Sequence, residues 1–359
     1  MMKLKTLVQA AMAVGLSSTL LCGALHAAPI AGHTQFELMK RYALSGNDRW
    51  DYVAYDAVRH HLFISRDNHV QVMDTVTGKQ VGEIRNTDGV HGFAFVQKLR
   101  LGFITNGRAD TITVVDLDTL KTVDTIKAGG PDPDGILYVP GLSRLYTSNG
   151  HDKSVSAIDP VTRKIVATMP VGGKPETAAA DNQGRIFVNV EDKGEIVEMD
   201  GKTNQVLAHW TLANCEEPSG LAIDTKTERL FTVCSNKHMM VIDANSGREV
   251  AQLPIGGHPD ATAFDPVLKT AFSSNGEDGT LTVVHEDDAN HFTVLQNMTT
   301  QQGAKSMALD SDHHRVYLVS AQFTPAAAAT ADNPHPRPGV APDTFNVLVA
   351  QPKSQSAGN

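Results

Sequence analysis

Apolar and polar positions alternate along most of the chain, in short runs separated by turns rich in Gly, Asn and Asp. Alternation of this kind predicts β-strands that bury one face. One type of run, an aromatic residue followed by strand-forming residues, occurs seven times, at 63–66, 103–106, 146–149, 187–190, 231–234, 272–275 and 317–320. We expect each to be the same strand of a repeated unit.

The spacing of the runs defines the repeat. The strand after each of the first six runs ends about 42 residues after its predecessor, in turn at Asp74, Asp116, Asp159, Asp200, Asp243 and His285. Outer strands follow, as at 79–84 and 248–253, and short innermost strands rich in small residues precede each run, at 52–56, 92–96, 135–139, 177–181, 220–224, 261–265 and 306–310. Four strands in each of seven units predict an all-β, seven-bladed β-propeller of four-stranded antiparallel blades.

The last unit lacks an outer strand of its own, because the strand at 345–350 is followed only by the polar tail 351–359. A strand at 36–44, directly before the first innermost strand, can take its place. We therefore expect an N-terminal outer strand to close the ring, which removes exposed sheet edges. The propeller then spans residues 28–350 as one domain.

The segments Phe103-Ile104-Thr105-Asn106 and Tyr146-Thr147-Ser148-Asn149 resemble the YVTN-repeat β-propeller family, especially its exported, YncE-like branch. The turns at 215–220 and 274–279 are similar too, and the resemblance covers residues 36–350. It implies the propeller fold, but for most members it implies no established reaction.

The N-terminus resembles a secretory signal. Lys3 and Lys5 precede an apolar stretch, and small residues near Ala27 provide a cleavage zone. We expect residues 1–27 to be removed, leaving a periplasmic or secreted protein without a membrane span. Because this segment contains two lysines and no acidic residue, its removal would change the net charge from −9 to −11. Such an acidic chain is a poor nucleic-acid binder. We expect a monomer.

Cleavage would leave two cysteines, Cys215 and Cys234, in an oxidising compartment. They lie on neighbouring segments of the fifth unit, so a disulfide between them is the expected state. The alternative is a thiolate metal ligand near His238, which no CxxC pair supports.

The loops that lead into the innermost strands converge on one face of a propeller, at the mouth of its channel. Counting back from the end of each innermost strand gives one equivalent position per blade. We call these seven residues the channel-mouth ring: Asp51, His91, Asp134, Glu176, Ser219, Asp260 and Lys305.

Two interpretations of the channel-mouth ring remain open. Carboxylate oxygens and an imidazole suit a divalent cation, and the same groups suit a cationic or polyhydroxylated ligand. The alternative is that the ring side chains only bind water in a water-filled channel, because polar groups there need no ligand. A divalent cation is thus the one cofactor that the sequence suggests.

The turns between the second and third strands provide further polar residues near this face. We call them the second layer: Arg66, Asn106, Asn149, Glu191, Asn236 and Asn275. The asparagines fit a structural role in their turns. Glu191, beside Asp192 and one strand from Glu176, is the stronger candidate for a site.

The final blade carries a long insertion, 322–344, with an alanine run and five prolines. Its composition favours an extended loop, which either overhangs the channel mouth as a lid or docking segment, or is a tolerated surface excursion.

The chain contains no nucleophile elbow, phosphate-binding loop or dinucleotide fingerprint. The first functional hypothesis is therefore a protein that binds a small-molecule or protein ligand at the loop face. The alternative is a lactonase-like hydrolase, in which ring acids with His91 or a metal activate water. A quinone-dependent dehydrogenase fits less well, because the chain has only two tryptophans, Trp50 and Trp210.

Overall fold

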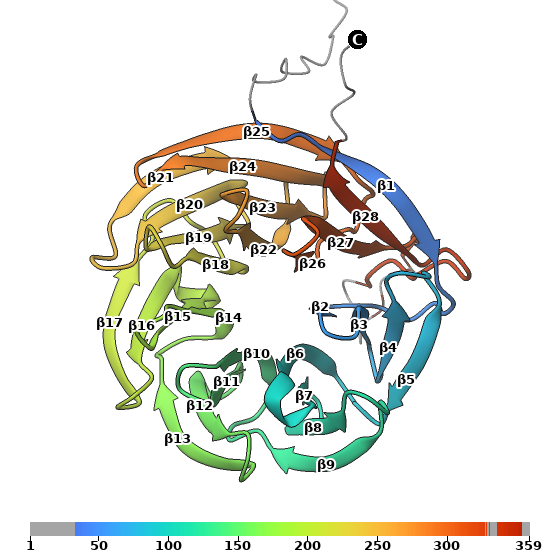
Figure 1. The fold of residues 1–359 in the computed structure, drawn as a ribbon, viewed down its shortest axis with the longest axis horizontal. Coiled ribbons are helices and arrows are strands. Elements are labelled where there is room, and N and C mark those ends of the chain that lie inside the picture. The colour runs from blue at the N-terminus through green and yellow to red at the C-terminus, as the bar shows by residue number, and fades with distance from the viewer. Residues whose placement is uncertain (1–32, 327, 329, 331–335, 354–359) are drawn as a thin grey trace, which may run out of the picture.

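The computed structural model describes residues 33–326, 328, 330 and 336–353. Within these residues the chain forms seven four-stranded antiparallel sheets arranged in a ring (Figure 1). The predicted seven-bladed β-propeller is therefore confirmed. The predicted signal at 1–27 lies outside the described residues.

Each blade is a meander from the channel to the rim. The innermost strands are β2 (Val53–Asp56), β6 (Val90–Val96), β10 (Pro133–Val139), β14 (Pro175–Ala180), β18 (Leu221–Asp224), β22 (Pro259–Asp265) and β26 (Met307–Asp310). The second strands are β3 (His61–Arg66), β7 (Leu101–Asn106), β11 (Arg144–Asn149), β15 (Arg185–Val190), β19 (Arg229–Cys234), β23 (Thr270–Asn275) and β27 (Arg315–Ser320).

The third strands are β4 (His69–Asp74), β8 (Thr111–Asp116), β12 (Ser154–Asp159), β16 (Glu195–Asp200), β20 (His238–Asp243), β24 (Thr280–Asp288) and β28 (Asn346–Pro352). The outer strands are β5 (Gln80–Arg85), β9 (Thr122–Lys127), β13 (Lys164–Pro170), β17 (Gln205–Thr211), β21 (Glu249–Pro254), β25 (His291–Thr299) and β1 (Phe36–Ala43). Two 3₁₀ turns, η1 (Gln97–Leu99) and η2 (Glu191–Lys193), are the only helical elements of the described chain.

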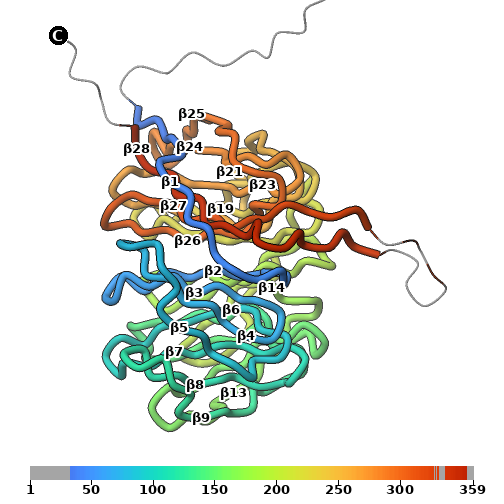
Figure 2. The backbone as a smooth tube through the Cα atoms, turned by 90° about the vertical axis from the view of Figure 1, so that its right-hand side faces the viewer, coloured from blue at the N-terminus to red at the C-terminus, as the bar shows by residue number. Residues whose placement is uncertain are grey.

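The ring is closed by its two ends. β1 pairs antiparallel with β28, with Phe36 opposite Pro352 and Ala43 opposite Asn346. Figure 2 shows β1 running along β28 on the flank of the disc. The predicted closure by an N-terminal strand is confirmed, and the last strand reaches Pro352, two residues into the segment predicted as a polar tail.

The core lies between the blades. The aromatic residue of every second strand, from Phe63 in the first blade to Tyr317 in the last, is at most 1% exposed. These rings contact the next blade: Phe63 lies 4.9 Å from Phe95, and Phe231 lies 5.1 Å from Phe264, measured between ring centroids. The repeated aromatic therefore holds neighbouring blades together.

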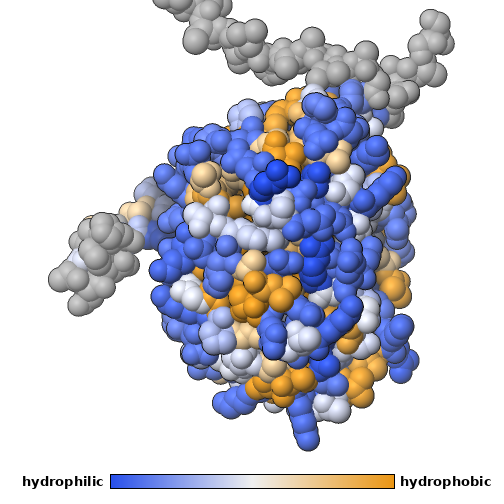
Figure 3. Space-filling view, turned by 90° about the vertical axis from the view of Figure 1, so that its left-hand side faces the viewer, coloured by the Kyte–Doolittle hydropathy of each residue, from blue (hydrophilic) through white to orange (hydrophobic). Residues whose placement is uncertain are grey.

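The rim is more polar. Figure 3 shows the flank of the disc that carries β13 and β17, where a mainly hydrophilic surface is broken by hydrophobic patches. Ile165, Val166 and Leu207, on these two outer strands, are each about half exposed. Scattered side chains of this kind are usual on a protein surface.

The turns after the third strands repeat one device in five blades. The aspartate at the end of the strand accepts a hydrogen bond from a backbone N–H three residues later, as from Thr77 to Asp74 (2.7 Å) and from Thr119 to Asp116 (2.8 Å). Asp159, Asp200 and Asp243 do the same. This explains why the sequence repeats an aspartate at that position.

The fifth blade contains the disulfide between Cys215 and Cys234, whose Cα atoms are 5.2 Å apart. It ties the segment before β18 to the end of β19. The predicted pairing is confirmed. In the described part of the chain, no helix has the length and apolar character to cross a bilayer.

Candidate functional site at the channel mouth

The residues of the channel-mouth ring occupy equivalent places around one end of the channel. His91, Asp134, Glu176 and Asp260 are the second residues of β6, β10, β14 and β22. Asp51, Ser219 and Lys305 lie two residues before β2, β18 and β26. Each ring residue lies five positions before the last residue of its innermost strand, or four in β14, so the seven occupy equivalent positions.

Five ring residues form a chain of alternating charge across five consecutive blades. The His91 Nδ1–H donates to Asp51 Oδ2 at 2.6 Å, and the same nitrogen lies 3.7 Å from Asp134 Oδ1. On the other side, Lys305 Nζ lies 3.6 Å from Asp51 Oδ1 and 3.0 Å from Asp260 Oδ2. Acids and bases therefore alternate from Asp134 through Asp51 to Asp260.

The remaining two ring residues have other partners. Lys174 Nζ lies 3.5 Å from Glu176 Oε2 and is also paired with Glu191. Ser219 is buried, and its hydroxyl donates to the backbone oxygen of Pro259. The structure therefore joins five ring residues in one chain of ion pairs and places Glu176 in a separate group with Lys174 and Glu191. Ser219 bonds to the backbone of the neighbouring blade instead.

Burial and unequal pairing separate the pKa values of these groups. Burial lowers the pKa of His91, but its hydrogen bond to Asp51 and the charge of Asp134 outweigh burial and raise it to about 9. Burial raises the pKa of Asp134 to about 6, against the opposing charge of His91. For Asp51, burial is overcome by His91 and Lys305, so its pKa is lowered.

Two other carboxyl groups have raised pKa values, which favours their protonated forms. Burial, aided by the charge of Asp134, raises the pKa of Glu176 well above its ordinary value. Burial also raises the pKa of Asp260, although Lys305 opposes it. The channel mouth therefore holds more carboxyl groups than its cations can keep ionised.

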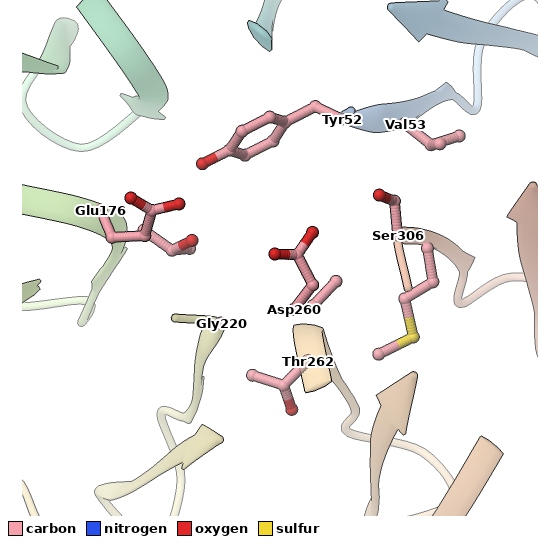
Figure 4. A pocket seen from close by; sticks show the side chains of 10 residues that line it. Tyr52, Val53, Glu176, Gly220, Asp260, Thr262 and Ser306 are labelled. Atoms are coloured by element: carbon pink, nitrogen blue, oxygen red, sulfur yellow. The ribbon is translucent and has the colours of Figure 1, made fainter. Parts of the chain in front are cut away.

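A cavity of about 130 Å³ lies between the innermost strands beside these carboxyl groups. Glu176, Asp260, Tyr52 and Ser306 are among the residues that line it. In Figure 4 the Tyr52 ring extends across the cavity towards the side of Glu176, and the Asp260 carboxyl group lies between the strands. The Tyr52 hydroxyl lies 3.4 Å from the place that a Cβ of Gly135, on β10, would occupy. Tyr52 thus partly fills the channel.

Sequence reasoning missed Tyr52, Lys174 and Ser306. A signal for Tyr52 was present: at the position directly after each ring residue, the other six blades carry Gly, Ala, Ser or Thr. A single large side chain among six small ones marks a residue that crosses the channel. Lys174 belongs to the loop before β14, and nothing local showed that it pairs with two acids.

Most of the second layer is not available to a ligand. Arg66 is fully buried, with its guanidinium 3.7 Å from the centre of the Phe345 ring and hydrogen-bonded to Gln71 and to the Asp48 backbone oxygen. Asn106, Asn149 and Asn275 are buried, and each amide donates to two hydroxyl groups of the next strand.

These four side chains lie inside the blades, where hydrogen bonds occupy part of the Arg66 guanidinium and the three amide nitrogens. Arg66 Nε and the Oδ1 atoms of Asn106 and Asn149 are buried there without a hydrogen-bond partner among the described residues. Asn236 donates to the Asn214 backbone oxygen in an exposed turn. Glu191, through Lys174, is the member that reaches the ring.

One set of metal-ligand types occurs within the ring. Ligand atoms of Asp51, His91 and Asp134 all lie within 4.8 Å of one another. With His91 protonated and bonded to Asp51, the imidazole Nδ1 is not free to bind a metal. A cation at this point would have to displace the imidazole proton.

The base of the 322–344 insertion lies close to this face. The ring of Phe323 stacks on Trp50, one residue before Asp51, at 5.8 Å between centroids. Arg49 donates to the Pro338 backbone oxygen. Figure 2 shows the described parts of the connection between β27 and β28 projecting beyond the disc.

Comparison with known proteins supports the architecture. No model of a known protein family matches the chain, and no curated protein sequence matches it either. Among solved structures, hydrazine synthase from Kuenenia stuttgartiensis is similar, with a TM-score of 0.68 and 16% sequence identity. The match covers 76% of this chain and 93% of that one. At this identity the likeness concerns the β-propeller fold alone.

Proposed function

We propose that the chain is an exported propeller that binds a small ligand at its channel mouth, through a positively charged or hydrogen-bond-donating group of the ligand. The observation that carries this proposal is a pair of buried acceptors. Asp134 Oδ1 and Glu176 Oε2 accept no hydrogen bond from the described residues, although His91 Nδ1 lies 3.7 Å from the first and Lys174 Nζ lies 3.5 Å from the second. A buried carboxyl oxygen without a hydrogen bond costs free energy, so a donor or cation placed there is favoured.

The charge balance supports the same ligand chemistry. The four ring carboxyl groups and Glu191 face three cations, His91, Lys305 and Lys174. A bound cation would stabilise the ionised forms of Glu176 and Asp134, whose pKa values are raised in its absence. Binding should therefore release protons and strengthen as the pH rises.

Titration calorimetry tests this, with Ca²⁺ and the small diamine 1,4-diaminobutane as probes, each at pH 5 and pH 7.5. We expect tighter binding at pH 7.5 for at least one probe, with proton release measured by comparing buffers of different ionisation enthalpy. Glu176→Gln should weaken that binding about tenfold or more, since it removes a charge-assisted contact. The matched control is Glu249→Gln, a change at an exposed position of β21. Equal affinities for the two variants, or no binding of either probe, would refute the proposal.

A second candidate function is a lactonase-like hydrolase. The observation in its favour is Asp134, whose pKa of about 6 suits a general base near neutral pH. His91, with its pKa near 9, is a cation there and would stabilise developing negative charge instead of accepting a proton. Metal analysis of the purified protein and a lactone-hydrolysis screen with Asp134→Ala decide this. Turnover lost in the variant would favour the hydrolase, and no turnover in the parent would exclude it for the lactones tried.

Export and membership of the YVTN-repeat, YncE-like group belong to the same proposal. The disulfide supports an oxidising compartment, and the fold supports the repeat assignment. Mass determination of the protein recovered from the medium or periplasm of an expressing cell would show cleavage after Ala27 as a loss of residues 1–27.

A further inference from the structure

The sixth blade lacks the aspartate that caps the turn after the third strand in five other blades. Where five blades carry the capping aspartate, this blade has His285, and β24 continues three residues further to Asp288. Asp288 Oδ1 there accepts the backbone N–H groups of Asn290 and His291, so the turn is capped later. The extension leaves His285 and Asp287 with no part in capping the turn.

The side chains freed in this way face each other. His285 Nε2 lies 4.0 Å from Asp287 Oδ1. The other oxygen of Asp287 accepts a 2.6 Å hydrogen bond from the Thr293 hydroxyl on β25, which fixes the carboxylate. A separation of 4.0 Å is too long for a hydrogen bond, so this nitrogen and this oxygen do not satisfy one another.

A third ligand type comes from the opposite end of the chain. His33 lies three residues before β1, and its ring centroid is 4.6 Å from that of His285. Ligand atoms of His33, His285 and Asp287 all lie within 4.8 Å of one another. All three side chains are partly accessible, so an ion could reach them from solvent.

The spacing suits a transition metal. Zinc binds imidazole nitrogen and carboxylate oxygen at about 2.0–2.2 Å, so two ligands of a tetrahedral ion are separated by roughly 3.3 Å. Separations of at most 4.8 Å reach that value by small side-chain rotations. Two imidazoles and one carboxylate are a zinc ligand set that leaves the fourth position for water.

We propose that His33, His285 and Asp287 form a binding site for a zinc-class divalent metal, which joins the segment before the closing strand to the sixth blade. β1 already makes two bonds to this blade, because Gln296 of β25 donates to the Phe36 backbone oxygen and accepts from its N–H, each at 2.9 Å. Figure 1 shows β1 starting beside β25. The metal would add a contact three residues before β1 and so hold the closing strand against the sixth blade.

The test is zinc titration of the purified protein without a polyhistidine tag. The channel-mouth ring contains its own His91, so the measurement is made in a His91→Ala background, where the proposed site stays intact. We expect one zinc ion per chain, bound about tenfold or more weakly after His33→Ala, and likewise after His285→Asp, which restores the residue of the other blades. His291→Ala, at the tip of the same hairpin, is the matched control and should bind as the background does.

Hydrogen exchange provides a second readout. Zinc should slow the exchange of β1 backbone amides in the His91→Ala protein and leave it unchanged when His33 is also replaced, because only a metal bound at His33 restrains that strand. The proposal is overturned if the His91→Ala protein binds no zinc, or if His33→Ala and His285→Asp bind it as tightly as His291→Ala does.

Discussion

At the scale of single residues, the neighbours of a ring position decide the pKa of its side chain. Asp51 and Asp134 are equivalent residues of different blades, and both face His91, yet their pKa values shift in opposite directions. The difference is that Asp51 receives the His91 hydrogen bond and the charge of Lys305, whereas Asp134 Oδ1 has no donor. The same residue type thus gives a fixed anion in one blade and a titrating group in another.

His91 provides a prediction at this scale. Its folded pKa of about 9 exceeds the ordinary value of 6.5, so its ion pair adds stability that is complete below pH 6.5 and disappears as the pH rises through 9. Asp51→Asn should lower the pKa of His91, because burial then acts with less compensation. Histidine resonances followed by NMR between pH 5 and 10 measure this shift. Asp67→Asn, which alters an exposed pair with Arg108, is the control and should leave it unchanged.

The residues also show where sequence reasoning ends. Counting back from the ends of the innermost strands found the ring, because the alternation along each strand shows where that strand ends in each repeat. The partners of Lys305 could not be found in this way, since they depend on how close three blades approach at the channel. Asn106 and Asn149 are of a residue type common in turns, and only the structure shows that their amides are buried and bond to the next strand.

At the scale of elements, small residues after the ring positions allow the innermost strands to crowd together. A Cβ added to Gly220 would lie 2.5 Å from the backbone nitrogen of Thr262 in the neighbouring blade. Backbone at that distance cannot rotate away as a flexible side chain does. The glycine is therefore required by the spacing between β18 and β22.

We expect Gly220→Ala to lower the free energy of unfolding by about 1–3 kcal/mol, the usual cost of overpacking. Gly141→Ala is the matched control, because nothing lies within 4 Å of its added methyl group. Urea unfolding followed by circular dichroism compares the two. Similar midpoints for both variants would mean that the blades can move apart at little cost.

Elements were easier to predict than their exceptions. The strands and the closing segment followed from alternation and spacing, and their ends differ from the prediction by one or two residues at most positions. The longer hairpin of the sixth blade was visible in the sequence only as His285 in place of an aspartate. Its meaning depends on His33, which lies some 250 residues away in the chain and beside it in the fold.

At the scale of the whole molecule, closure makes every blade depend on the N-terminal strand. Without β1, the backbone groups of β28 would form a free edge, and Phe36, fully buried against Phe272, would leave a gap between the last two blades. We expect deletion of residues 29–46 to give aggregated or unfolded protein in size-exclusion chromatography. Removal of residues 354–359, beyond the end of β28, is the control. A monomeric, fully folded product of the first deletion would contradict this role of β1.

The pairing of β1 with β28, seen in Phe36 opposite Pro352, also has a consequence for the order in which the strands can pair during folding. A ribosome makes the first strand of this seam long before the last, and a chain that crosses a membrane delivers it first. For that whole interval β1 has no permanent partner, while six blades can already form behind it. We therefore expect the pairing of β1 with β28 to form last during folding.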